Sequence, residues 1–151
     1  LSTYLSPSLV ELNLRGSTKT EIIDELLDML DRSQMVADME AARQAVLARE
    51  QSMSTGLQHG VAIPHGRTSA VDHLVCAVGI KPGGIDFESL DGQPTTIFVL
   101  TLSPVDKPAP HVQFMSAISQ VLDEQGREAI LGARTRQQLY DALTRPAESS
   151  S

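Results

Sequence analysis

The stretch that most constrains the fold is residues 60–67, with the sequence GVAIPHGR. Its first four residues are apolar or small and predict a short buried strand. Pro64 is expected to end that strand, because proline fixes its own φ angle and holds the preceding residue extended. His65 is then expected where a buried strand reaches the surface, with little backbone freedom. Gly66 has no Cβ atom, so another backbone or a ligand can approach the imidazole closely.

Arg67 places a permanent cation two residues after His65, and its planar guanidinium group suits oxyanions. An accessible imidazole beside a cation is typical of a nucleophile or a proton-transfer group. The alternative is a turn at the end of a strand, with a histidine that faces solvent. The eight residues alone leave both interpretations open.

Helical and strand patterns alternate along the rest of the chain. Apolar and β-branched runs predict strands, including a short edge segment, at residues 9–14, 74–80, 85–87 and 95–102. Periodic apolar residues with capping residues predict helices at residues 18–32, 38–50, 110–124, 128–131 and from 135 to about 143. Glycine, proline and small polar residues predict turns or loops at residues 51–60, 81–84, 90–94 and 103–110.

This order predicts an α/β fold in a single layered domain. Turns of hairpin length in the middle of the chain favour a mixed β-sheet flanked by helices. We expect the domain to cover residues 1–146 and residues 147–151 to form a flexible tail.

Composition limits the classes of partner. A net charge of −7, with 12 Lys+Arg and 3% aromatic residues, argues against nucleic acid as the main partner. No apolar run approaches the roughly 18 residues that a membrane-spanning helix needs, so we expect no direct membrane insertion. The single cysteine, Cys76, lies in an apolar run and is expected to be buried rather than reactive.

The N-terminus shows no basic segment followed by an apolar one, so no export signal is visible. One cysteine cannot form an internal disulfide, which fits a reducing compartment. We therefore expect a cytoplasmic location. The chain does not begin with Met, so a removed leader or an origin in a larger protein stays open.

His111 is the second histidine of interest, because it follows the sequence Pro108-Ala109-Pro110 and opens a predicted helix after the strongest strand. Ligands of α/β sheets usually bind where strands lead into helices, so His65 and His111 are expected to converge. The start of a helix also favours an anion. His59 and His73 are expected to be solvated loop residues.

Arg49 ends a predicted helix and is followed by a loop that contains Ser54 and Thr55. A cation, hydroxyl groups and a glycine just before the His65 strand are typical of an oxyanion-binding wall. The alternative, which the residues alone favour, is a basic residue near the negative end of a helix dipole.

Two other kinds of site fit the sequence less well. A zinc site is disfavoured because no CxxC, HxxxH or HExxH spacing occurs. A serine hydrolase is disfavoured because no GxSxG turn occurs. We expect neither a metal nor another cofactor.

Taken in order, these motifs resemble the fructose/mannitol-type EIIA domains of the phosphotransferase system, including their nitrogen-regulatory relatives. The resemblance rests on motifs spread over nearly the whole chain: Arg49-Glu50, Ser54-Thr55-Gly56, the sequence GVAIPHGR at 60–67 and His111.

The resemblance implies a phosphohistidine carrier with His65 as the nucleophile. His65 would take a phosphoryl group from the histidine carrier HPr and pass it to a cysteine of an EIIB partner. His111 would contact the phosphoryl oxygens and Arg49 would offset their charge. Ser54 or Thr55 would supply hydrogen bonds, and Gly66 and Arg67 would support the site. Phosphoryl transfer between two proteins needs no cofactor in this scheme, only positioning and charge stabilisation.

Two further roles share the same site residues. One is a nitrogen-type regulatory EIIA, whose phosphorylation state would control a potassium transporter or a kinase. The other is an EIIA-like module of a larger transporter. The sequence does not separate these roles from a sugar-uptake component, nor does it identify the sugar.

Overall fold

The computed structural model describes residues 4–144. It contains one five-stranded sheet in the order β1-β4-β5-β2, with β3 also pairing with β5. The pairs β1–β4, β2–β5 and β3–β5 are parallel, and the pair β4–β5 is antiparallel. The predicted fold class, a mixed sheet flanked by helices, is therefore confirmed. The predicted tail, 147–151, lies outside the described residues, and the predicted domain limits stay a prediction.

The two central strands of the sheet are long and the other three are short. The strands are β1 (Val10–Glu11), β2 (Val61–Ala62), β3 (His65–Arg67), β4 (Val75–Ile85) and β5 (Thr95–Ser103). The two long strands, β4 and β5, are central in the sheet and carry continuous apolar runs. A short 3₁₀ turn, Pro7–Leu9, precedes β1, so the strand predicted at 9–14 is reduced to two residues.

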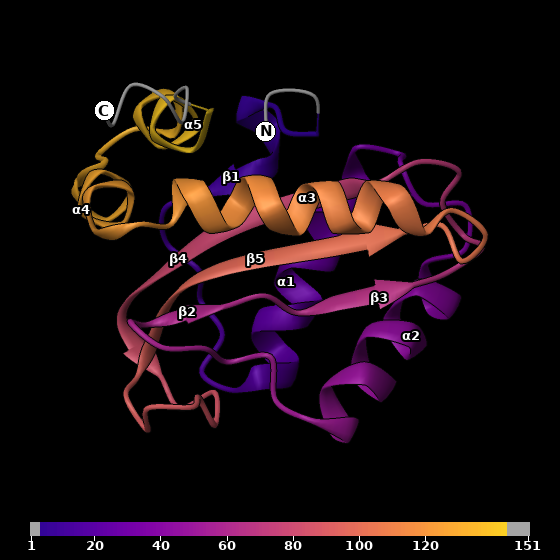
Figure 1. The fold of residues 1–151 in the computed structure, drawn as a ribbon, viewed down its shortest axis with the longest axis horizontal. Helices are drawn as coiled ribbons and strands as arrows, with labels where there is room; N and C mark the ends of the chain where they lie inside the picture. Colours follow the sequence, from indigo (N-terminus) through magenta and orange to yellow (C-terminus); the bar gives the residue numbers. More distant parts are fainter. Residues whose placement is uncertain (1–3, 145–151) are drawn as a thin grey trace.

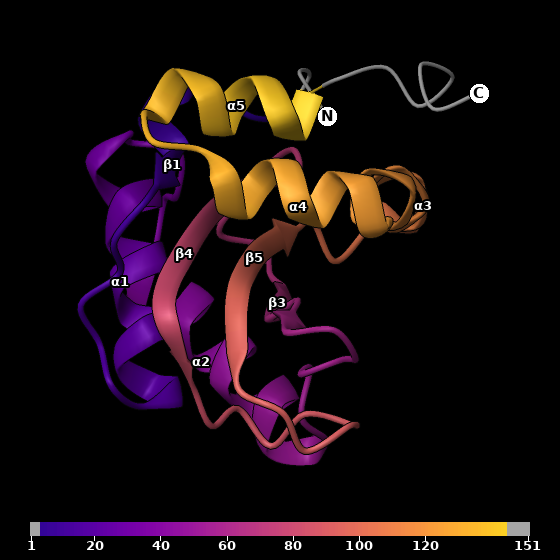
Figure 2. The same cartoon turned by 90° about the vertical axis from the view of Figure 1, so that its left-hand side faces the viewer.

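Helices cover both faces of this sheet (Figures 1 and 2). The helices are α1 (Lys19–Arg32), α2 (Met39–Ser52), α3 (Pro108–Val121), α4 (Glu124–Gly132) and α5 (Arg136–Thr144). Helices α1 and α2 lie on one face, where α1 packs on β4 and α2 packs on β3, and α3 lies on the other. Helix α5 packs beside β1.

Side-chain caps fix the starts of the first two helices, as predicted. Thr18 accepts a hydrogen bond from Glu21 N at 3.2 Å, and Asp38 accepts one from Ala41 N at 3.1 Å. Such caps satisfy backbone N–H groups that have no partner within the helix.

Two segments predicted as turns or loops belong to regular elements in the structure. Residues 81–84, predicted as a turn, continue strand β4 with a shift of register between Ile80 and Ile85. Gly83 and Gly84 take φ angles of +82° and +75°, which lets the extra residues bulge out of the ladder. Residues 108–110, predicted as irregular, form the first turn of α3. Prolines are tolerated there because the first N–H groups of a helix have no partner within it.

The prediction that Pro64 ends the strand is also wrong in one respect, because pairing with β5 resumes at His65 as strand β3. The Pro64 carbonyl oxygen accepts a hydrogen bond from Thr101 N at 3.0 Å, so the ladder to β5 passes through the proline. Pro64 lacks an N–H group, but its carbonyl oxygen keeps the bond to β5, and the other edge of this segment is bonded to residues 55–57 through Val61 and Ile63.

Gly66 lies against the backbone of α2 and positions β3 on that helix. An added Cβ atom would lie 2.9 Å from Val46 N and 3.1 Å from Ala45 C. The close approach expected at Gly66 therefore occurs, and the neighbouring backbone is that of α2.

We predict that Gly66→Ala destabilises the protein by about 1–3 kcal/mol, because the new methyl group meets backbone atoms that cannot move away freely. Chemical denaturation measures the change. Gly132→Ala is the matched control, since a Cβ atom at Gly132 meets nothing within 4 Å. Equal stability of the two variants would contradict this account of the β3–α2 contact.

Candidate functional site

The structure brings His65 and His111 together. Their ring centroids lie 5.3 Å apart, with the ring planes tilted by 40°. His65 begins β3 and His111 lies in the first turns of α3, so two elements that are distant in sequence converge as the sequence predicted. Both side chains are partly exposed, which leaves the pair accessible from solvent.

A backbone carbonyl group fixes the proton of the His65 ring. His65 Nδ1 lies 2.9 Å from the Ile63 carbonyl oxygen. A carbonyl oxygen only accepts hydrogen bonds, so Nδ1 must carry the proton and donate it. Nε2 then keeps its lone pair, and the ring is held in the tautomer that presents Nε2 as a nucleophile.

Pairing with β5 fixes the direction in which His65 points. His65 pairs with Thr101 and Arg67 pairs with Ser103, and residues opposite each other in neighbouring strands face the same side of a sheet. His65 contacts His111 of α3, so these alternate residues face α3. Gly66, between them, faces α2.

The environment of His111 favours its neutral form. Burial lowers the pKa of the His111 imidazole, and the nearby His65 and Arg67 lower it further. His111 Nδ1 is buried and has no hydrogen-bond partner among the described residues. Helix α3 itself offers few free donors here, because Pro108 and Pro110 both lack N–H groups.

Arg67 is oriented by the loop that joins β5 to α3. Its Nη2 atom donates to the Val105 carbonyl oxygen at 3.0 Å. Its charge acts on His111 from this position. Arg67 therefore adds positive potential beside the histidine pair, in a chain whose net charge is −7.

Arg49 is one helical turn beyond the part of α2 that contacts Gly66. Its Nη1 atom donates to the Met53 carbonyl oxygen at 2.7 Å, across the end of α2. Within the described residues, no hydrogen bond joins Arg49 to either histidine, so its role in charge stabilisation stays a prediction.

The hydroxyl groups of Ser54 and Thr55 serve the loop rather than the histidine pair. Ser54 Oγ lies 2.6 Å from the Phe87 carbonyl oxygen and accepts from Gly56 N at 3.0 Å. Thr55 Oγ1 donates to Glu50 Oε1 at 2.6 Å. That Ser54 or Thr55 contacts a phosphoryl group stays a prediction.

Glu50 is the anchor of that loop, a role that its place in the Arg-Glu motif does not predict. Its carboxylate is buried and accepts from Thr55 N at 2.9 Å, besides the Thr55 hydroxyl. Lys19 Nζ lies 2.8 Å from the same carboxylate. Burial acts to raise the pKa of Glu50, but the hydrogen bonds from Lys19 and Thr55 outweigh it and hold that pKa below its usual value.

The loop is connected to His65 by two further hydrogen bonds. Ile63 N donates to the Thr55 carbonyl oxygen at 3.1 Å, and the Ile63 carbonyl oxygen accepts from the His65 ring. A continuous chain of contacts therefore leads from Glu50 through Thr55 and Ile63 to the imidazole. No pattern in the sequence indicates this chain of contacts, because the burial of Glu50 is set by the tertiary fold.

The remaining histidines and the cysteine lie apart from this pair. His73 is exposed and its Nδ1 contacts Asp72 at 2.6 Å, as expected of a loop residue. Burial raises the pKa of the Cys76 thiol to about 12, which confirms the prediction of a buried, unreactive cysteine. Within residues 4–144, no three His, Cys, Asp or Glu side chains are grouped to hold a metal ion.

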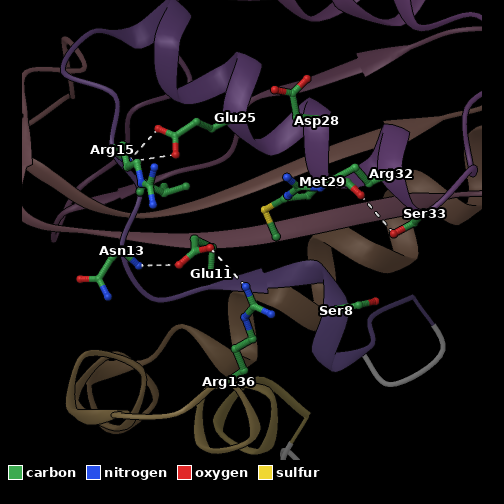
Figure 3. Close-up of a pocket in the computed structure, with 11 residues that line it drawn as sticks. Ser8, Glu11, Asn13, Arg15, Glu25, Asp28, Met29, Arg32, Ser33 and Arg136 are labelled. Atoms are coloured by element: carbon green, nitrogen blue, oxygen red, sulfur yellow. Dashed lines mark hydrogen bonds and ion pairs between the residues drawn. The ribbon is translucent and has the colours of Figure 1, made fainter.

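A pocket of about 520 Å³ lies at the opposite edge of the sheet, between the β1 segment, α1 and α5 (Figure 3). Its charged lining is balanced, with Arg136 Nη2 lying 3.5 Å from Glu11 Oε1. Glu25 accepts hydrogen bonds from the backbone N–H groups of Arg15 and Gly16. These contacts hold the surrounding segments in place, and no histidine lines the pocket.

Comparisons with known proteins identify the family of the chain. The family model for "Phosphoenolpyruvate-dependent sugar phosphotransferase system, EIIA 2" matches residues 3–145. The chain is 34% identical over 149 residues to the fructose-specific EIIA component of Haloferax volcanii, covering 98% of this chain and 97% of that protein. The chain belongs to this EIIA family of phosphotransferase-system components. A scan of the described helices finds none both long and apolar enough to span a membrane.

Other relatives differ in size and in role. The chain is 31% identical over 144 residues to the fructose-specific EIIABC component of Bacillus subtilis, covering 95% of this chain and 23% of that protein. The nitrogen regulatory protein IIA-Ntr of Neisseria meningitidis is a structural neighbour with a TM-score of 0.86 and 25% identity, covering 94% of this chain and 97% of that one. An Escherichia coli complex of enzyme IIAMTL with phosphorylated enzyme IIBMTL shares the fold, with a TM-score of 0.80, 20% identity and coverage of 94% and 98%.

We predict that Glu50→Gln lowers the free energy of unfolding by about 1.5–3 kcal/mol, because it weakens charged hydrogen bonds in a buried setting. The lowered pKa means that this contribution is present above the ordinary carboxyl pKa and is lost as the pH falls through the folded-state value. The difference from the parent protein should therefore narrow on acidification, as denaturant titrations at several pH values would show.

Glu88→Gln is the matched control, because Glu88 also contacts Lys19, at 2.9 Å, but its side chain is 73% exposed. An exposed pair contributes little, so we expect a change below about 0.5 kcal/mol. Similar losses in the two variants would contradict the anchoring role of Glu50.

We predict that His111 titrates below the ordinary histidine pKa, because its imidazole is partly buried beside two basic groups. A lowered pKa makes the unfolded chain the better proton acceptor, so the contribution of His111 to stability is present above about pH 6.5 and lost below its folded-state pKa. NMR titration of the His111 ring measures this directly, and a midpoint at or above 6.5 would contradict it.

Proposed function

We propose that this chain is a phosphohistidine carrier of the phosphotransferase system. His65 Nε2 takes a phosphoryl group from an HPr-type phosphocarrier protein and passes it to a cysteine of an EIIB partner during sugar uptake. The observation that carries the proposal is the hydrogen bond from His65 Nδ1 to the Ile63 carbonyl oxygen, which makes Nε2 the nitrogen with the lone pair in the neutral ring.

The transfer step balances without a cofactor. Nε2 attacks phosphorus, a P–N bond to Nε2 forms, and the P–N bond to the donor histidine breaks with its electron pair going to the leaving nitrogen. The proton on His65 Nδ1 stays hydrogen-bonded to the Ile63 carbonyl oxygen, and that oxygen stabilises the positive charge that the ring gains. In the onward transfer a cysteine thiolate attacks phosphorus, a P–S bond forms, and the P–N bond breaks with its electron pair returning to Nε2.

Positive groups around the pair support the developing charge. Arg67 is held beside His111, and Arg49 approaches from α2 in the proposed complex. Phosphoryl transfer depends mainly on such positioning and charge stabilisation. Neutral His111 would donate one hydrogen bond to a phosphoryl oxygen.

Exposed apolar side chains around the pair fit a protein as donor and acceptor. Val105 is 52% exposed in the β5–α3 loop, and Val112, next to His111, is 64% exposed. Apolar patches of this kind are typical of protein–protein contacts. The known complex of an enzyme IIAMTL with a phosphorylated enzyme IIBMTL supports an EIIB partner, and a cytoplasmic location is part of the proposal.

A second role, the nitrogen-type regulatory EIIA, is favoured by the TM-score of 0.86 to the Neisseria IIA-Ntr structure. In that role the phosphorylation state of His65 would control a transporter or a kinase instead of feeding an EIIB domain. The fructose EIIABC relative supports a third arrangement, in which the chain is one module of a larger transporter.

We predict that the His65→Ala protein takes no label from phosphoenolpyruvate in the presence of the general phosphotransferase enzymes, because the nucleophile is absent. His111→Ala should still take some label, and Arg49→Ala should fold normally but be labelled slowly. Radiolabel on gels over time measures all three variants. Full labelling of His65→Ala would exclude the proposal, and an unchanged rate in Arg49→Ala would remove Arg49 from the site.

A further inference from the structure

Lys19, at the start of α1, contacts three other groups of the protein. Its Nζ atom lies 2.8 Å from Glu50 Oε2, near the end of α2, and 2.9 Å from Glu88 Oε1. The same atom lies 4.9 Å from the centre of the Phe87 ring. Only 21% of the Lys19 side chain is exposed, so its ammonium group is largely removed from water and committed to these partners.

The two carboxylates beside Lys19 differ in how much they depend on it. The Glu88 side chain is 73% exposed and stays hydrated, so its pair with Lys19 contributes little. The Glu50 side chain is 7% exposed, and among the described residues its ion pair is with Lys19 alone. A buried carboxylate without a countercharge is strongly unfavourable, so Lys19 stabilises the charged form of Glu50 in this position.

Charged Glu50 holds Thr55 by both its backbone and its side chain. Glu50 Oε2 accepts from Thr55 N at 2.9 Å, and Glu50 Oε1 accepts from the Thr55 hydroxyl group at 2.6 Å. Hydrogen bonds to a charged acceptor are about twice as strong as those between neutral groups. Loss of the charge on Glu50 would therefore weaken both bonds to Thr55 together.

Thr55 in turn supports the carbonyl group that His65 uses. The Thr55 carbonyl oxygen accepts from Ile63 N at 3.1 Å, and the Ile63 carbonyl oxygen lies 2.9 Å from His65 Nδ1. The peptide bond between Ile63 and Pro64 has no N–H group, so no donor of its own anchors it. Neighbouring bonds must orient its plane, and the bond from Ile63 N to Thr55 is one of the two backbone bonds that flank it.

We propose that Lys19 is a positioning residue for phosphoryl transfer. Its charge keeps Glu50 bound to Thr55. Thr55 then keeps the Ile63 carbonyl group turned toward the His65 ring, which fixes the proton on Nδ1. Lys19 is on α1, on the face of the sheet opposite α3, so it acts through the nucleophile and not by contact with a phosphoryl group (Figures 1 and 2). The role in transfer rests on the proposed function, whereas the effect on the His65 proton does not.

The first test is long-range ¹H–¹⁵N NMR of the unphosphorylated, histidine-labelled full chain with neutral rings, which shows which nitrogen of His65 carries the proton. We expect the Nδ1–H tautomer in the parent protein and in Lys19→Arg, which keeps the cation. Lys19→Met keeps an unbranched side chain without the charge and should give a mixture of tautomers.

Arg43→Met is the matched control, because Arg43 also joins α2 to α1, with Nε 2.7 Å from Asp24 Oδ1. Neither Arg43 nor Asp24 belongs to the path from Lys19 to His65. The control variant should therefore leave the His65 signals unchanged.

The second test labels the same variants with a phosphorylated HPr-type carrier protein over a range of donor concentrations. Lys19→Met should lower the maximal rate about tenfold, as is usual when a group that orients a functional histidine is removed. The donor concentration that gives half the maximal rate should not change, because Lys19 lies on the opposite face from the histidine pair. Arg43→Met should be labelled as fast as the parent protein.

A parent protein with the proton on Nε2 of His65, or a Lys19→Met spectrum equal to that of the parent, overturns the proposal. An equal change in Arg43→Met also overturns it, because any loosening of α1 on α2 would then suffice. A shifted tautomer with an unchanged maximal rate removes the role in transfer.

If Lys19→Met does not fold, Thr55→Val replaces it, because this variant removes one of the two bonds to Glu50 and leaves the ion pair intact. It should shift the His65 tautomer in the same direction, and an unshifted spectrum overturns the proposal. If the tautomer shifts while His65→Ala is still labelled, the positioning of the His65 proton stands and the proposed function fails.

Discussion

The hydrogen bond between His65 Nδ1 and the Ile63 carbonyl oxygen is the contact on which the site depends. It joins a ring to a backbone group only two residues away, in a segment that stays in register with β5 through Pro64. Pairing of β3 with β5 on one side and the close contact of Gly66 with α2 on the other hold that conformation. Pro64 and Gly66 thus help to fix the orientation of the His65 imidazole.

This arrangement explains why a buried ion pair lies some distance from the chemistry. Glu50 and Lys19 hold the backbone of Thr55, and Thr55 in turn holds Ile63. The geometry of the nucleophile is therefore supported by charges that need not touch a phosphoryl group. Such indirect support is common where a functional group must be held within a fraction of an ångström.

The sequence was sufficient to predict the fold class, the two central strands and the meeting of His65 with His111. Those predictions depend on local patterns: continuous apolar runs for β4 and β5, and strand-to-helix order for the histidines. It failed at residues 81–84, where proline and two glycines are typical of a turn but here form a bulge, because β5 offered a partner on the far side. Propensity is local, whereas strand pairing is decided by the rest of the fold.

The sequence could not assign the hydroxyl groups around the site. Ser54 and Thr55 occupy motif positions, yet their hydroxyl groups bind Phe87 and Glu50. Side-chain direction of this kind depends on tertiary pairing, which a single sequence does not specify.

The start of α3 has a consequence for how firmly an anion is held. Many phosphate sites grip their ligand with a row of backbone amides at the beginning of a helix. Pro108 and Pro110 have no backbone N–H group, so fewer amides are available here. A bound anion would therefore be held mainly by side chains, which can change conformation. In the proposed carrier, a phosphoryl group held mainly by side chains would keep a high tendency to leave, which suits relay rather than storage.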